Sequence, residues 1–184
     1  GKGLSGGMIT VRPSGNADFV AEQNTIIGNT VLYGATSGTL LAAGQAGERL
    51  CVRNSGATAI VEGCGSNGCE YMTGGQTIIL GETGSNCGAG MTGGMAFIYD
   101  PKGEFLSKAN PETLHISRLS DGHWNTHLNS LLQLHHDETG SALAGRLLNH
   151  WDREAGHFWH VVPLEILERL DHPVTAASSL NAIA

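Results

Sequence analysis

Two copies of one short stretch decide the fold of this chain: GSNGCEYMTGG at residues 65–75 and GSNCGAGMTGG at residues 84–94. The copies share GSN at the start and MTGG at the end, and they align without a gap. Short apolar runs recur beside them, in GTLLAAG from residue 38, GATAIVEG from 56, GQTIILG from 75 and GMAFIYD from 94. The copies are 19 residues apart, and a fixed period of this length is typical of a solenoid built from repeated coils.

The period predicts a right-handed parallel β-helix with about 19 residues per turn. One coil cannot bury its own apolar face, but stacked coils hydrogen-bond to one another and share a continuous interior. Glycines between the apolar runs permit the positive φ angles that bent strands need at their corners. The opening GKGLSGGMITV resembles GAGMTGGMAFI at residues 88–98, so a first coil begins the chain, and its extra residues fit an outward loop around residues 14–23.

Stacked coils place equivalent side chains in columns. When the period of the repeat is used as the offset, alternation along each strand predicts two inward columns and one outward column between them. An exposed apolar column needs a cover, so we expect the outward one to lie against the C-terminal helices or a neighbouring domain. The inward columns are Leu40, Ala59, Ile78, Phe97 and Ala42, Val61, Leu80, Tyr99; the outward column is Leu41, Ile60, Ile79, Ile98.

Composition divides the chain near residue 100. Of 27 glycines, 22 lie in the first hundred residues, whereas all nine histidines and all three tryptophans follow residue 114. We expect a glycine-rich β-helix over residues 1–103 and a helical extension over 104–184 that packs on or beside it. In the extension we predict a helix capped by Asp121 and ended by Gly140, a second helix capped by Ser141, a strand at 158–162, and a short helix from Leu164.

The charge and hydropathy of the chain exclude two classes of partner. Its formal charge is −7, and its ten Lys and Arg residues are scattered, so we predict no nucleic-acid partner. No run approaches the roughly 20 apolar residues of a membrane span. We therefore predict no membrane association and a cytoplasmic location.

Two patterns suggest cofactor binding or catalysis, and each has a structural alternative. GxGxxG occurs at residues 1–6 and 88–93, but a strand is expected after each match, whereas a dinucleotide fingerprint needs a helix there. Glu62 and Asp100 fall in one predicted column two turns apart, as a polysaccharide-cleaving pair would. Without sugar-binding aromatic residues around them, we interpret both as part of a solvated face.

The histidines and cysteines are the candidate metal ligands. On the predicted helix, His123 and His127 are four residues apart, and His135 and His136 follow two turns later, but no HExxH motif accompanies them. His157 and His160 form a weaker pair. The four cysteines, Cys51, Cys64, Cys69 and Cys87, have no CxxC spacing, so we expect free thiols.

GKGLSGGMITVRP, GNTVLYGATSG, AAGQAGERLCVRNSGATAIVEGCGSNGCEYMTGG and LGETGSNCGAGMTGGMAFIYD closely resemble the C-terminal β-helical (GXGXG) domain of the glutamate synthase large subunit. The resemblance spans residues 1–100, and FWHVVP at 158–163 resembles the end of that subunit. It implies a scaffold domain that places the amidotransferase and FMN-binding synthase domains, with a possible small subunit, in a cytoplasmic enzyme of ammonia assimilation and glutamate biosynthesis. It also implies that this chain is a fragment, since further coils usually precede GKGLSGG.

The resemblance carries no catalytic residue to this chain; FMN and an iron-sulfur cluster are implied for the parent enzyme alone. One alternative is a β-helical subunit of a related oxidoreductase, N-methylglutamate synthase or formylmethanofuran dehydrogenase. Another is a polysaccharide-active enzyme. We assign no residue to catalysis, cofactor binding or metal binding, and we assign a structural role to Gly56, Gly65, Asn67, Gly74, Gly75, Gly84, Asn86, Gly93, Gly94, Ile60, Ile79 and Ile98.

Overall fold

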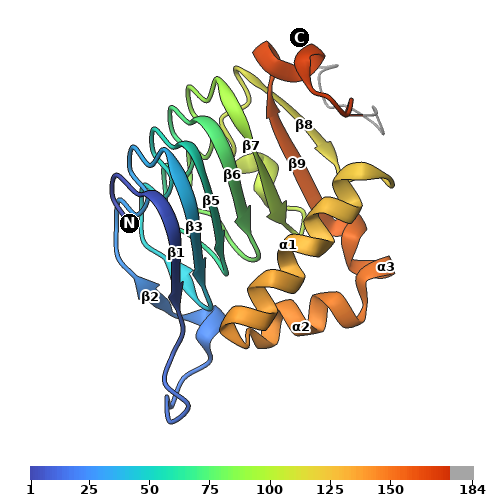
Figure 1. The fold of residues 1–184 in the computed structure, drawn as a ribbon. Helices are drawn as coiled ribbons and strands as arrows, with labels where there is room; N and C mark the ends of the chain where they lie inside the picture. The colour runs from blue at the N-terminus through green and yellow to red at the C-terminus, as the bar shows by residue number, and fades with distance from the viewer. Residues whose placement is uncertain (175–184) are drawn as a thin grey trace.

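The computed structural model describes residues 1–174, which form a solenoid of parallel coils with a layer of helices against its outer face (Figure 1). The strands are β1 (Ser5–Val11), β2 (Thr25–Ile27), β3 (Ser37–Ala42), β4 (Gln45–Ala46), β5 (Ser55–Val61), β6 (Thr73–Ile79), β7 (Gly93–Tyr99), β8 (Leu114–Arg118) and β9 (Phe158–Pro163). The α-helices are α1 (His123–Thr139), α2 (Ala142–Asn149) and α3 (Trp151–Glu154), and 3-10 turns lie at Ala21–Gln23, Phe105–Ser107, Ala155–His157 and Leu164–Arg169.

The main sheet of the described residues has seven strands in the order β1-β3-β5-β6-β7-β9-β8. Strands β1, β3, β5, β6 and β7 are parallel and belong to successive coils, which confirms the predicted solenoid. Of the last two strands, β9 was predicted and β8 was not. Strand β9 runs antiparallel to both of its neighbours, β7 and β8. The extension therefore continues the sheet as well as covering it.

Glycine allows the coils to approach one another closely at their corners. An added Cβ would lie 2.2 Å from the Thr36 carbonyl oxygen at Gly56, and 2.3 Å from the Ser66 amide nitrogen at Gly84. Neither distance is compatible with a real side chain. The other glycines of the predicted repeat also lie against the preceding coil, with the nearest backbone atoms at 2.1–2.9 Å: Gly65, Gly74, Gly75, Gly93 and Gly94.

In the second full coil an asparagine supports a corner that other coils build with glycine. The strand register aligns Gly38, Ala57 and Gly75, and both glycines have positive φ angles, of 98° and 80°. At Ala57 the buried Asn54 side chain accepts hydrogen bonds from the Gly56 and Ala57 amides and donates to the Ala57 carbonyl, at 2.8–3.2 Å. The amide side chain thus fixes the backbone where a residue with a Cβ replaces glycine.

One register shift corrects the predicted columns. Thr39 pairs with Thr58, a full period further along, but Thr58 pairs with Gln76, one position short of a full period, because β5 has one additional residue near its start. Beyond β5 the inner and outer positions are therefore exchanged relative to the prediction. The outer column is Leu41, Ile60, Ile78, Phe97, and the inner columns are Leu40, Ala59, Thr77, Ala96 and Ala42, Val61, Ile79, Ile98.

The outer column is covered by the helices, as the sequence predicted for the apolar face. Leu41 and Ile60 are fully buried in a cluster that includes Leu128 and Leu132 of α1. Figure 1 shows α1 running across the sheet, with α2 beside it. No helix within residues 1–174 is long and apolar enough to cross a bilayer.

The ends of α1 follow the sequence signals in part. Gly140 ends the helix in the left-handed conformation, with φ of 69°, as predicted. The N-cap prediction was wrong, since Gly122 and not Asp121 occupies that position, and no side chain caps the helix there. Ser141 caps α2 as predicted, because its Oγ accepts a hydrogen bond from the Ala144 amide at 3.0 Å.

We expect Gly75→Ala to destabilise the fold far more than Gly103→Ala. Both glycines have positive φ, 80° and 76°, but a Cβ at Gly75 would lie 2.3 Å from the Ala57 carbonyl oxygen, whereas Gly103 has nothing within 4 Å. The Gly103 change costs only the left-handed strain, about 1–2 kcal/mol. The Gly75 change adds a clash with backbone that cannot move, for a total of roughly 4 kcal/mol. Urea unfolding followed by circular dichroism measures both, and equal losses would refute the argument from close approach.

Candidate functional site

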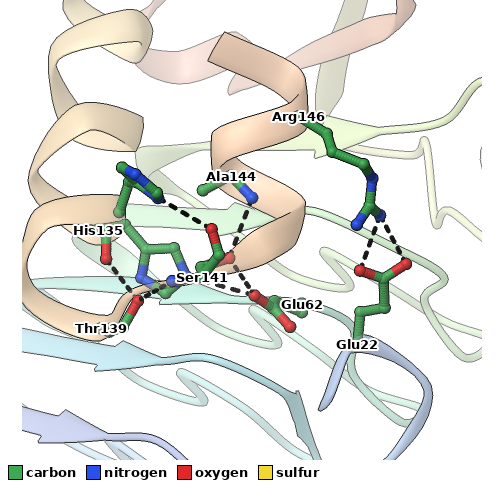
Figure 2. Close-up of polar contacts among 8 residues, drawn as sticks. Glu22, Glu62, His135, Thr139, Ser141, Ala144 and Arg146 are labelled. Carbon is green, nitrogen blue, oxygen red and sulfur yellow. Dashed lines mark hydrogen bonds and ion pairs between the residues drawn. The ribbon is translucent and has the colours of Figure 1, made fainter. Parts of the chain in front are cut away.

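A buried polar cluster lies where the corner between α1 and α2 meets the end of β5 (Figure 2). Glu62 directly follows β5 and is only 2% exposed. The Ser141 hydroxyl donates a short hydrogen bond to Glu62 Oε1, and the His135 Nε2 atom lies 3.8 Å from the same oxygen. The Thr139 hydroxyl donates to the His135 carbonyl and accepts from the Ser141 amide. The cluster therefore ties three segments, β5, α1 and α2, to one carboxylate.

The cluster contains the residue types of a serine hydrolase but not their geometry. In a catalytic triad the histidine lies between the serine and the acid and takes the hydroxyl proton. Here the Ser141 hydroxyl bonds directly to Glu62, and neither ring nitrogen of the fully buried His135 has a hydrogen-bond partner. The Ser141 oxygen is also occupied as the cap of α2. The arrangement is suited to fastening the helices to the solenoid.

We expect Ser141→Ala to destabilise the protein by about 2–3 kcal/mol, since it removes a helix cap and a donor to a buried carboxylate. Ser130→Ala is the matched control, because the Ser130 hydroxyl is exposed and donates to the His127 carbonyl of its own helix. That control is expected to change stability by less than about 0.5 kcal/mol. Thermal unfolding measures both; a Ser141 effect as small as that of Ser130 would contradict a fastening role.

A groove of about 730 Å³ runs beside this cluster, between α2 and the edge of the solenoid. Its floor is partly apolar, with Leu80, Ile98 and Leu147 among the lining residues. Oppositely charged side chains pair along its rim, at N–O distances of 2.6–3.3 Å: Arg146 with Glu22, Lys102 with Glu82, Lys108 with Glu104, and Arg153 with Glu154. The groove therefore has an apolar floor and a charged rim, and most of the charged side chains on the rim are paired with one another.

The register shift separates the two candidate carboxylates. Val61 pairs with Ile79 and Ile79 with Ile98, so Asp100 stands one position away from the column of Glu62, and the predicted alignment was wrong. Asp100 Oδ1 accepts from the Glu104 amide, and its Oδ2 accepts from the Phe105 amide and the Trp159 indole, at 2.9–3.0 Å. Burial opposes ionisation of Asp100, but these hydrogen bonds outweigh it and lower its pKa. A carboxylate held ionised in this way is a poor general acid.

The candidate metal ligands are dispersed. The His123 ring stacks on His172 at 3.5 Å between centroids, and His127 Nε2 lies 2.6 Å from Gln76 Oε1. His136 Nδ1 is 2.9 Å from the Ser141 carbonyl oxygen, whereas His135 lies beside Glu62. Within residues 1–174, no group of three or more His, Cys, Asp or Glu side chains is arranged to hold a metal ion.

Several of the histidines instead form an aromatic layer under α1. His160 is almost fully buried and stacks on Phe97 at 4.5 Å, and Trp124 of α1 lies 5.3 Å from its ring. Burial, and secondarily the proximity of His115 and His127, lowers the pKa of His160 to about 3. Burial also lowers the pKa values of His115 and His127. These rings hold α1 on the sheet in their neutral form.

The layer predicts a loss of stability in mild acid. A histidine whose pKa is lowered on folding binds protons more readily when unfolded, so its contribution is complete above pH about 7 and declines as the pH falls below about 6.5. We expect the urea concentration at the unfolding midpoint to decrease when the pH is lowered from 7.5 to 5.0. His160→Phe keeps the stacking and removes the proton site, so it should flatten this decline. A midpoint that rises toward pH 5.0, or a profile unchanged by the substitution, would be inconsistent with the neutral layer.

The four cysteines are free and lie in the solenoid core, as expected from their spacing. Burial raises the pKa of Cys64 to about 12 and raises that of Cys51. The pKa of Cys87 is raised by its contact with Cys69 and by burial, whereas that contact lowers the pKa of Cys69. These thiols therefore pack as small apolar side chains in the core of the solenoid.

Both GxGxxG matches run into strands, β1 and β7, as predicted, so neither opens a helix. The asparagines of the repeat have the same left-handed φ of 61°. Asn86 Nδ2 donates to Asn67 Oδ1 at 2.9 Å, and Asn110 Nδ2 donates to Asn86 Oδ1 at 3.0 Å. This ladder joins two corners of the repeat to Asn110, in the residues that follow β7.

Sequence reasoning missed two supporting residues. The NSG at residues 54–56 carries an ordinary turn signal that marks Asn54 as a residue with local hydrogen bonds. Arg118 had no signal: its guanidinium lies 3.6 Å from the Trp159 ring centroid and donates to the His157 carbonyl at 2.8 Å. Only the pairing of β8 with β9 brings these residues together.

The stacked parallel strands and the glycine corners define a parallel β-helix. Residues 1–164 match the model of the family described as GXGXG motif, and the chain belongs to that family.

The chain is also similar to parts of much longer proteins. It is 56% identical over 182 residues to the glutamate synthase [NADPH] large chain of Azospirillum brasilense, covering 99% of this chain and 12% of that one. It is 49% identical over 172 residues to the glutamate synthase [NADH] of Schizosaccharomyces pombe, covering 92% of this chain and 8% of that one. With ferredoxin-dependent glutamate synthase 2 of Synechocystis sp. it shares 47% identity over 163 residues, 89% of this chain and 10% of that one.

Proposed function

We propose that this chain is the β-helical part of a glutamate synthase large subunit, and that it fixes the relative placement of the amidotransferase and FMN-binding synthase domains without supplying catalytic groups. The parent enzyme makes glutamate from glutamine and 2-oxoglutarate. The similarity over 99% of this chain to a glutamate synthase large chain supports the first part. The match covers only 12% of that relative, which leaves ample chain for catalytic domains in the remainder.

One observation carries the noncatalytic part of the proposal: the groups best suited to chemistry are engaged in holding the fold. Glu62 binds Ser141, Ser141 caps α2, and Asp100 binds two backbone amides and an indole. The groove beside them has its rim charges paired. FMN and the iron-sulfur cluster of the parent enzyme then bind in its other domains.

The proposal also separates this region from the choice of electron donor. Relatives named for NADPH, NADH and ferredoxin match the chain at 56%, 49% and 47% identity. A surface that bound one of these donors would differ among the three groups, because ferredoxin is a protein and the nucleotides are small molecules. We propose that the donor is chosen elsewhere in the enzyme. We also propose a cytoplasmic setting for the chain.

Substitution in the intact large subunit tests the noncatalytic role. We expect Asp100→Asn to leave kcat for glutamate formation within about threefold per folded subunit, whereas loss of a catalytic acid or base costs about 100-fold or more. Glu138→Gln, a change at an exposed helix position, is the matched control. The folded fraction is measured by gel filtration before each assay. A 100-fold loss in correctly folded Asp100→Asn enzyme would overturn the noncatalytic assignment.

A further inference from the structure

Two corners of the solenoid share a backbone conformation but differ in the residue that follows the asparagine. Asn67 and Asn86 both have φ of 61°, and both are half-buried. Asn67 is followed by Gly68, whereas Asn86 is followed by Cys87. Of the asparagines in the sequence, only Asn67 precedes a glycine. The two corners therefore form an internal comparison for the chemistry of a side-chain amide.

An asparagine side chain can lose its amide group when the backbone nitrogen of the next residue attacks Cγ. This intramolecular reaction needs a nitrogen that is free to approach, a polarised carbonyl group and an amide group that is free to leave. A glycine in the next position favours the reaction, because it has no side chain to hinder rotation of the peptide.

At Asn67 the reacting groups are unengaged. Within residues 1–174 the Gly68 N–H donates to no acceptor, and Asn67 Nδ2 has no hydrogen-bond partner. Asn67 Oδ1 accepts the hydrogen bond from Asn86 Nδ2 at 2.9 Å, and this bond draws electron density away from Cγ. The corner thus combines a free nucleophile, an activated carbonyl and a free leaving group.

At Asn86 two of the three groups are engaged. The Cys87 amide donates to the Lys108 carbonyl at 3.1 Å, and Asn86 Nδ2 donates to the oxygen of Asn67. Asn86 Oδ1 accepts from Asn110 Nδ2 at 3.0 Å, so its Cγ is polarised in the same way. The two corners therefore match in the carbonyl group and differ in the nucleophile and the leaving group.

We propose that Asn67 is a site of spontaneous deamidation, and that the isoaspartyl product loosens the coil stack at this corner. The Gly68 nitrogen bonds to Asn67 Cγ and releases its proton to solvent, the Cγ–Nδ2 bond breaks, and Nδ2 leaves as ammonia after taking a proton from solvent. Water then opens the resulting ring. Addition of water at Cγ gives aspartate, and addition at the main-chain carbonyl gives isoaspartate. No oxidant or reductant takes part.

The isoaspartyl form does not fit the corner, because its backbone runs through Cβ and Cγ and is longer by one atom. The Asn67 amide donates to the Ser85 carbonyl at 2.9 Å, and the Cys69 amide donates to the Leu50 carbonyl at 2.8 Å. These two bonds join the coil to both of its neighbours. An additional backbone atom between the two amides moves at least one of them away from its acceptor.

Peptide mapping by mass spectrometry tests the site. The folded, intact protein is incubated in mildly alkaline water enriched in heavy oxygen, which labels each new carboxyl group. We expect conversion at Asn67 to be at least about tenfold faster than at Asn86. Gly68→Ala, whose Cβ would lie 3.2 Å from Cys64 Sγ, is expected to slow conversion at Asn67 by about tenfold. Equal conversion at the two asparagines of the wild-type protein would overturn the proposal.

Cys87→Gly separates the effect of hydrogen bonding from that of sequence. It places an asparagine–glycine pair at the second corner, where the N–H of residue 87 and Asn86 Nδ2 both have acceptors in the wild-type protein. We expect conversion at Asn86 in this variant to stay at least about fivefold slower than at Asn67, because the reacting groups are held by those bonds. Equal rates in the folded variant, checked by circular dichroism, would refute the argument from free groups.

Hydrogen exchange tests the loosening. In protein that has been aged until residue 67 is largely isoaspartate, we expect amide exchange in residues 65–75 and 84–94 to accelerate by about tenfold or more. Asn67→Asp is the matched control, because its carboxylate can still accept from Asn86 and its backbone has the ordinary length, so exchange in both segments should stay close to that of fresh protein. Aged protein that exchanges like fresh protein would contradict the proposed loosening.

Discussion

The structure depends on how closely one coil can lie against the next at its corners. At Gly74, Gly84 and Gly93 the backbone of the preceding coil fills the space where a Cβ would be, at 2.1–2.3 Å. That proximity aligns the strands for parallel hydrogen bonding and brings the inner side chains into one core. Apolar side chains alone would not impose this close approach, because they can also be buried in a more widely spaced stack of coils. The glycines permit this approach because they have no Cβ. The coil that has Ala57 in place of a glycine uses the Asn54 side chain to hold its backbone.

A second constraint is that the sheet is apolar on both faces. The inner face closes on itself in the coil, but the outer column of Leu41, Ile60, Ile78 and Phe97 must be covered from outside. Helices α1 and α2 supply that cover, and the Glu62 cluster fixes their corner to β5. The residues that first suggest hydrolytic chemistry are therefore explained by the joint between two layers. A carboxylate buried at such a joint needs a donor, and the cap residue of α2 is the donor that the fold brings nearest.

The sequence predicted the features that depend on local chemistry or on the repeat itself. The solenoid, the left-handed end of α1 at Gly140, the Ser141 cap and the strand from Phe158 all follow from patterns within a few residues or one period. The shift at β5 did not, since a single extra residue is invisible when copies are aligned glycine to glycine, yet it exchanges inner and outer side chains. Strand β8 was missed although the turn signal SDG at residues 120–122 separates its sequence, LHISR, from the helix after it; its place in the sheet depends on its pairing with β9, 40 or more residues further along. The fate of Glu62 depended on a contact 79 residues away, which no local pattern encodes.

The antiparallel direction of β9 has a consequence for the length of the array. A further copy of the repeat would need to form parallel bonds along the free side of β7, but β9 already occupies that side through pairs such as Ile98 with Trp159. Strand β8 pairs with the other side of β9, so β9 has no free edge for a further strand. Strand β9 therefore ends the series of parallel coils at β7. A neighbouring molecule at that end would meet β8, the edge strand of the described sheet, in place of an open coil of the repeat.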